Sequence, residues 1–142
     1  MKKLRCVIDT NVLVSALLVK RTLPFQVVEW IFTAGIILRS EATSSELMEV
    51  LGRKKFDKYI TTEERQVFFS KFLVASELVN VKVGVEACRD PRDDKFLAVG
   101  VNGNADLIIS GDDDLLSLHP FRGIQILSPQ AFLMIAKGSE NK

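Results

Sequence analysis

The sequence has few of the residues on which many catalytic and metal sites are built. His119 is its only histidine, so neither a His-based triad nor a zinc cluster with several histidine ligands is expected. Cys6 and Cys88 are its two cysteines, which are too few for a disulfide scaffold and lack metal-ligand spacing. We interpret both as small apolar residues with free thiols in a reducing compartment.

Long hydrophobic runs are also missing. No stretch of about 18 apolar residues occurs, so no membrane-spanning helix and no membrane partner are expected. The apolar run that follows Met1 to Lys3 is interrupted by Asp9 and Asn11, and no small-residue cleavage site follows it, which argues against a signal peptide. We therefore expect a cytoplasmic protein.

The composition is that of an ordinary globular domain. Its 142 residues suffice for one domain with a single substantial core, and 47% are hydrophobic and 26% charged. The net charge of +1 hides an uneven distribution, because acidic residues outnumber basic ones in 86–114 whereas basic residues outnumber acidic ones before it. This asymmetry predicts an acidic centre beside a mildly basic surface.

Short apolar runs alternate with helical patterns along the chain. Strands are expected at about 4–8, 36–38, 78–83, 107–109 and 124–127, and helices at about 11–18, 24–34, 44–52, 61–75, 94–102 and 128–136. Such alternation is typical of a parallel sheet covered by helices. We predict one α/β domain over 1–137, with a central, mostly parallel five-stranded sheet flanked by helices, and a disordered tail at 138–142.

Acidic residues stand where the strands end or the next helices begin. Asp9 follows the first strand, Glu46 lies in the helix after the second, Asp93 and Asp94 open the helix after the third, and Asp112 to Asp114 follow the fourth. Parallel strands all end at the same edge of a sheet, so these groups are expected to converge. Converging carboxylates repel one another unless a cation joins them, and without His or Cys the natural choice is a hard divalent cation such as Mg²⁺ or Mn²⁺.

Each acid also has a purely structural interpretation. Asp9 could cap the helix that follows it, and Glu46 completes a capping-box pattern with Thr43. The acids at 93–94 could be favoured by a helix dipole, and those at 112–114 could form a solvated turn. None of these interpretations predicts that all four groups meet at one sheet edge, and we therefore favour a metal site.

Four segments together resemble the PIN-domain ribonucleases, and most closely their prokaryotic branch of toxins similar to VapC. The segments are 7–13, 45–47, 90–98 and 105–116. An Asp-Thr-Asn after the first strand and a Ser-Gly-Asp-x-Asp-Leu after the fourth are the most specific parts. The resemblance extends from residue 4 to about 132 and implies a single PIN-like domain.

The resemblance also implies roles for individual residues. The four acids of the family fall on Asp9, Glu46, Asp94 and Asp112, and its neighbouring polar positions fall on Asn11 and Ser110. The cation would be held by Asp9, Asp94 and Asp112, while Glu46 would orient or deprotonate the attacking water or help to bind a second cation.

Two of these placements have a competitor next to them in the sequence. Asp93 competes with Asp94, and Asp114 competes with Asp112. Asp94 is preferred because it stands three residues before Leu97 and Ala98, as the family pattern requires.

The implied activity is Mg²⁺- or Mn²⁺-dependent endoribonucleolytic hydrolysis of RNA phosphodiester bonds, by the toxin of a toxin–antitoxin pair. A homodimer or higher oligomer and a small antitoxin protein are the implied partners. The basic cluster at 53–58 could follow the RNA backbone or be a solvated helix end.

Two other functions remain compatible with the sequence. An acid-cluster phosphohydrolase acting on small phosphate esters would carry Asp-x-Asp after the first strand, where this chain has Asn11. A non-catalytic protein-binding module would use the acids only as helix caps.

Overall fold

Short runs of β-branched residues and leucine form the central sheet. The computed structural model describes residues 3–140, and within them the strands are β1 (Arg5–Ile8), β2 (Ile36–Arg39), β3 (Ser76–Leu78), β4 (Leu107–Ile109) and β5 (Gln125–Leu127). All neighbouring strands are parallel, in the order β3-β2-β1-β4-β5. The predicted α/β class and five-stranded sheet are confirmed, and the sheet is parallel throughout.

The helices follow the strands and begin at the caps that the sequence provides. They are α1 (Thr10–Leu18), α2 (Leu23–Ala34), α3 (Glu41–Leu51), α4 (Thr62–Ala75), α5 (Asp94–Asn102), α6 (Asp113–Leu116) and α7 (Pro129–Glu140), with short 3₁₀ helices η1 (Lys54–Phe56) and η2 (Pro91–Asp93). Thr22, Ser40 and Thr61 each accept a backbone N–H from the first turn of α2, α3 or α4.

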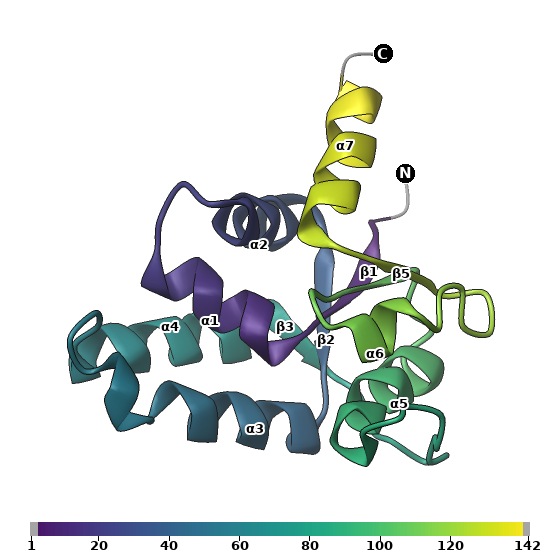
Figure 1. Ribbon diagram of the computed structural model, residues 1–142, viewed down its shortest axis with the longest axis horizontal. Coiled ribbons are helices and arrows are strands. Elements are labelled where there is room, and N and C mark those ends of the chain that lie inside the picture. Colours follow the sequence, from purple (N-terminus) through teal and green to yellow (C-terminus); the bar gives the residue numbers. More distant parts are fainter. Residues whose placement is uncertain (1–2, 141–142) are drawn as a thin grey trace.

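The core lies on both faces of the sheet. Successive side chains of a strand point to opposite faces, so Cys6 and Ile8 pack with α1, α2 and α7, whereas Val7 packs on the other side with Phe96 and Leu97 of α5. Figure 1 shows α5 and α6 on the opposite side of the sheet from α1 and α2. Because β1 is central and buried on both faces, the residue that follows it emerges in the middle of the sheet edge.

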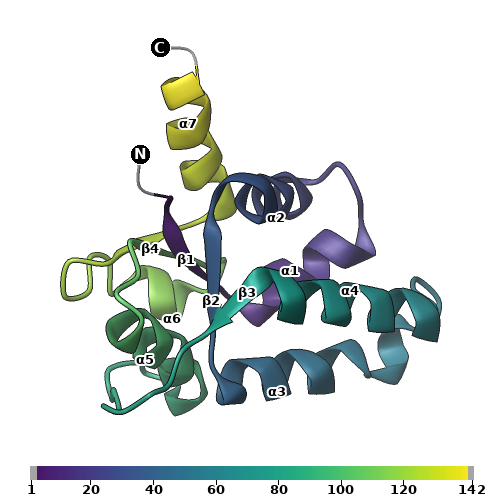
Figure 2. The same cartoon turned by 180° about the vertical axis from the view of Figure 1, so that it is seen from behind.

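The predicted third strand at 78–83 was misplaced. β3 begins at Ser76, directly after α4, and ends at Leu78 at the edge of the sheet (Figure 2). Its partner β2 ends at Arg39, whose carbonyl accepts the N–H of Val79 at 2.7 Å. Beyond this point the chain has no paired strand beside it, and Val83 is 58% exposed.

Three further boundaries differ from the sequence-based expectation. α3 starts three residues earlier than predicted because Ser40 caps it, and residues 113–116 form α6 where only a turn was expected. α7 continues to Glu140, through much of the predicted tail. The remaining tail residues 141–142, like residues 1–2, lie outside the described residues.

Across residues 3–140, no single helix is long and apolar enough to cross a membrane. Only α1 and α2 taken together, bent by 106°, reach the required length and composition.

Candidate active site

Asp9 leaves β1 at the centre of the sheet edge and is almost completely buried, with 5% exposure. Its N–H donates to the carbonyl of Ile109 on β4 at 2.9 Å. Its Oδ1 accepts the N–H of Asn11 at 3.3 Å, which caps α1, and its Oδ2 accepts the hydroxyl of Ser110 at 2.7 Å. Capping is therefore one role of Asp9, and it uses one oxygen of a carboxylate that also faces the site.

Burial raises the pKa of Asp9, and the nearby charges of Asp112 and Glu46 raise it further. The hydrogen bonds from Ser110 and Asn11 lower the pKa but do not cancel the effect of burial. Burial therefore makes the ionisation of Asp9 harder than that of an exposed aspartate, and a bound cation would offset this effect.

Asp93, Asp112 and Asp114 form an acidic cluster beside Asp9. One carboxylate oxygen from each lies within 4.8 Å of the others. Asp112 caps α6 by accepting the N–H of Asp114 at 2.9 Å, and its own N–H donates to Ser110 Oγ at 3.0 Å. The loop after β4 thereby fixes the position of Asp112 relative to Asp9.

The environment of Asp93 reflects this crowding. Burial raises the pKa of Asp93 to about 7, and the charge of Asp112 and a hydrogen bond between the two carboxyl groups contribute to the increase. Asp9 and Asp90 contribute smaller repulsions. Two carboxyl groups that share a proton in this way are suited to exchanging it for a metal ion.

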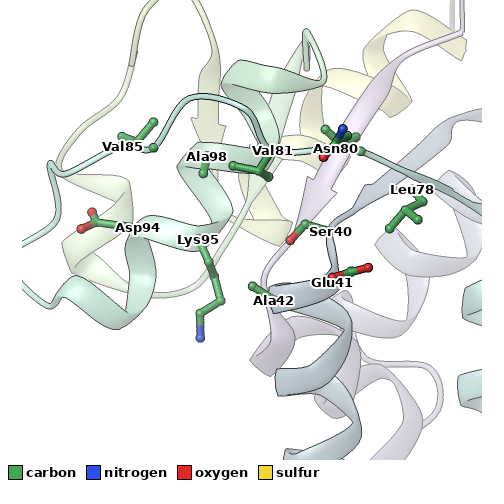
Figure 3. A pocket seen from close by; sticks show the side chains of 12 residues that line it. Ser40, Glu41, Ala42, Leu78, Asn80, Val81, Val85, Asp94, Lys95 and Ala98 are labelled. Carbon is green, nitrogen blue, oxygen red and sulfur yellow. The ribbon is translucent and has the colours of Figure 1, made fainter.

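Asp94, the residue preferred from the sequence, lies elsewhere. Its Oδ1 accepts the backbone N–H groups of Ala87 at 3.0 Å and Cys88 at 2.7 Å, and these bonds lower the pKa of Asp94. It lines a separate groove of about 670 Å³, and Figure 3 shows it pointing to a different side of α5 from Lys95. In the structure Asp93 joins the acidic cluster, while Asp94 anchors the loop before η2, and we therefore take Asp93 as the candidate ligand at this position.

Glu46 reaches the site from the second turn of α3. The capping box that was one interpretation of Glu46 is formed instead by Ser40 and Thr43. Glu46 Oε1 accepts a hydrogen bond from Lys95 Nζ at 2.7 Å, and Oε2 accepts one from the Thr10 hydroxyl. Glu46 therefore takes no part in capping α3, and its carboxylate is held by hydrogen bonds from Lys95 and Thr10.

These residues line one depression of about 260 Å³. Its walls carry Asp9, Asn11, Glu46, Asp93 and Asp112, together with Thr10, Val50, Arg53, Asp90, Arg92 and Phe96. Of the predicted site residues, Asp9, Asn11, Glu46, Asp93 and Asp112 lie here; Ser110 contacts Asp9 and Asp112 from below the surface.

Sequence reasoning assigned no role in the site to Thr10, Arg92 or Lys95. All three lie inside the segments that carried the family resemblance, 7–13 and 90–98, but nothing in their spacing showed which acid each would contact. Arg53 was noted only as part of the basic cluster. In the structure Arg53 and Arg92 are each oriented by a neighbouring carboxylate, of Glu49 and Asp90 respectively.

The donors gathered here fit a hard divalent cation. Carboxylate oxygens are the ligands that Mg²⁺ and Mn²⁺ prefer, and Asp9, Asp93 and Asp112 present them from three different elements. Burial raises the pKa of Asp9 and of Asp93, and repulsion from neighbouring carboxylates adds to the increase. A cation at this point would face Asp93 and Asp112, with Asp9 lining the same depression; Asp114 belongs to the cluster but is ion-paired with Arg89 at 2.8 Å.

Comparison with protein families gives a match over most of the chain. The family model for the PIN domain matches residues 5–114. The uncharacterized protein MJ1680 of Methanocaldococcus jannaschii is 35% identical over 122 residues, which cover 82% of this chain and 76% of that protein.

Two solved structures share the fold. PAE2754 from Pyrobaculum aerophilum superposes with a TM-score of 0.63 at 14% identity, covering 95% of this chain and 90% of its own. VapBC2 from Rickettsia felis, solved bound to a DNA fragment from its promoter, superposes with a TM-score of 0.59 at 12% identity, covering 88% of this chain and 98% of its own. At these identities the structures support the fold alone.

Proposed function

The chain belongs to the PIN-domain family, and from this we propose that it is a metal-dependent endoribonuclease that hydrolyses phosphodiester bonds in RNA with Mg²⁺ or Mn²⁺. The membership supports a nuclease at the level of the family. The observation that carries the proposal for this chain is the convergence of Asp9, Asp93 and Asp112 with Glu46 in one depression at the sheet edge.

Each side chain has a role in the proposed reaction. Asp9, Asp93 and Asp112 would hold the cation, which would lower the pKa of a bound water and neutralise charge on the phosphate. Glu46 accepts a hydrogen bond from the attacking water through a lone pair that Lys95 and Thr10 leave free.

Two arginines extend the site toward the substrate. Arg53 and Arg92 line the depression from the end of α3 and from η2, and each guanidinium is oriented by an adjacent carboxylate. Arginine binds phosphate through its planar fork of donors. We assign them the phosphates on either side of the cleaved bond.

The toxin role is a further part of the proposal. VapBC2, which shares the fold, was solved as a complex with promoter DNA, and the sequence resembles VapC toxins. A groove of about 500 Å³ between α1, α2 and α4 is lined by apolar residues that include Phe25, Val28 and Phe68, and by charged residues that include Glu29 and Lys71. We propose that a helix of a small antitoxin binds there, that the protein forms a homodimer or higher oligomer, and that it acts in the cytoplasm.

The test is cleavage of single-stranded RNA by the purified protein with Mg²⁺, with Mn²⁺ and with EDTA. Cleavage should require the cation, and Asp9→Asn should reduce it by about 100-fold or more, since even changes behind a metal ligand cost about 10–100-fold. Asp57→Asn, the same change at an exposed carboxylate, should cleave as the wild type does. Equal cleavage by Asp9→Asn and the wild type would exclude the proposed site.

The same preparations separate the rival functions. Turnover of p-nitrophenyl phosphate without RNA cleavage would favour a phosphohydrolase of small phosphate esters. Activity on neither substrate in the presence of Mn²⁺ would favour a non-catalytic binding module.

A further inference from the structure

The carboxylate of Glu46 is held differently from the other acids of the site. Its Oε1 accepts a hydrogen bond from the ammonium group of Lys95 at 2.7 Å, and its Oε2 accepts one from the buried Thr10 hydroxyl. The acids of the cluster at Asp93 and Asp112 instead face each other. Glu46 alone among these site acids is paired with a lysine.

The pair is partly withdrawn from solvent. The side chains of Lys95 and Glu46 are each 25% exposed, compared with 84% for Arg92, whose ion pair stands at the surface. Charges that are partly buried are screened less by salt and water than exposed ones. The positive charge of Lys95 therefore acts on the nearby carboxylates with less screening than an exposed lysine would have.

The start of α5 places this charge beside the cluster. Asp93 occupies the N-cap position of α5 without a capping hydrogen bond and interacts with Asp112, whereas Lys95, two residues later, reaches across to Glu46 on α3. Figure 3 shows the Lys95 side chain leaving α5 toward the first turns of α3. The start of α5 thus supplies the carboxylate of Asp93 to the acidic cluster and the ammonium group of Lys95 to Glu46.

A divalent cation and Lys95 compete for the same carboxylate. Mg²⁺ binds about 2.0–2.1 Å from its oxygen ligands, so an ion on Glu46 would lie close to the Lys95 ammonium and be repelled by it. We propose that Lys95 takes the place of a second metal ion: the chain binds one divalent cation, at Asp9, Asp93 and Asp112, and Glu46 is positioned by Lys95 without being a ligand. This inference rests on the proposed metal-dependent function.

The competing explanation is that Lys95 only ties α5 to α3. Loss of a purely structural ion pair would lower the melting temperature and leave the number of bound metal ions unchanged. The number of Mn²⁺ ions per chain therefore distinguishes the two explanations without any measurement of activity.

The experiment is calorimetric titration of the full chain with Mn²⁺ alone. The wild type should bind one ion, Lys95→Met should bind two because Glu46 is released, and Lys95→Arg, which keeps the charge, should bind one. Lys82→Met removes an exposed lysine from the loop after β3 and is the matched control, which should bind one ion.

If Lys95→Met does not fold, a charge-balanced variant tests whether Glu46 is a ligand. Glu46→Gln combined with Lys95→Met leaves the net charge unchanged and should bind a single ion, because Glu46 is not a ligand in the wild type. Loss of all Mn²⁺ binding in the folded double variant would overturn the inference. Two ions in the wild type, or one in a folded Lys95→Met, would also overturn it.

RNA cleavage measured on the same samples separates this inference from the proposed function. A wild type that binds no Mn²⁺ overturns both. One ion in the wild type and two in Lys95→Met, with no RNA cleavage by the wild type, supports the role of Lys95 and overturns the ribonuclease.

Discussion

The hydroxyl of Ser110 donates a hydrogen bond of 2.7 Å to Oδ2 of Asp9, and both side chains are buried. The same oxygen of Ser110 accepts the backbone N–H of Asp112 at 3.0 Å. One hydroxyl therefore fixes the relative positions of two of the proposed metal ligands, one after β1 and the other after β4.

Ser110→Ala should weaken both the fold and the site. Asp9 would lose its strongest side-chain donor, and the free energy of unfolding should fall by about 1–3 kcal/mol, the range for a buried polar group that loses its partner. Mn²⁺ affinity should fall by about 10–100-fold, as when the groups behind metal ligands are removed. Denaturant unfolding and calorimetry measure the two effects. Ser117→Ala, at an exposed serine on the same loop, should show neither.

Asp93→Asn and Asp94→Asn should have opposite effects on Mn²⁺ binding, RNA cleavage and stability. Asp93→Asn removes a ligand, so Mn²⁺ binding and RNA cleavage should fall by about 100-fold or more, while the apo protein should become more stable because a repelled carboxylate is gone. Asp94→Asn should keep both activities and lower the melting temperature, because its carboxylate accepts two backbone N–H groups. The reverse assignment of the two profiles would restore Asp94 as the ligand.

The stability of the apo protein should fall as the pH rises from about 4 to about 7. The pKa of Asp93 rises from 3.8 to about 7 on folding, so in this range the native state holds a proton that the unfolded state has released. Stability from this group is complete below pH 3.8 and is lost as the pH rises through about 7. Melting curves in EDTA across this range measure the slope, which should be smaller in Asp93→Asn. An equal slope in both proteins would rule out Asp93 as its source.

Mn²⁺ should stabilise the wild type against heat. A ligand that binds only the native state adds about 2.7 kcal/mol at about 100 times its dissociation constant, which corresponds to an increase of several degrees in melting temperature. Asp9→Asn should show little of this increase, while Asp57→Asn should show all of it. No shift of the wild type at millimolar Mn²⁺ would contradict a metal site.

Most strands and helices could be predicted because the periodic spacing of their apolar residues is a local signal, which contacts with distant residues do not change. The strand at 107–109 and the helix at 94–102 were predicted with the observed bounds, because an apolar run and a capped amphipathic segment are both local signals. β3 was misplaced because its length depends on β2, a partner that is distant in the sequence. The alternation in 78–83 carried no information about where β2 ends.

The site shows the same limit at the level of single residues. The sequence placed Asp9, Glu46 and Asp112 at one edge, because strand ends are visible in the pattern. It favoured Asp94, whereas the structure brings Asp93 to the cluster, because neighbouring helical positions point about 100° apart and the choice depends on where the helix starts. η2 at 91–93 directly precedes that start, and Asp94 accepts the N–H groups of Ala87 and Cys88, contacts that no local pattern shows.

The central position of β1 also determines when the site can form during synthesis. Asp9 is made about a hundred residues before Ile109 and Ser110, whose backbone carbonyl and hydroxyl hold it. Until β4 has been synthesised and has paired with β1, Asp9 has neither of these partners and Asp112 does not exist. A growing chain on the ribosome therefore carries no assembled acidic site, and the proposed activity is restricted to chains that are complete at least through α6.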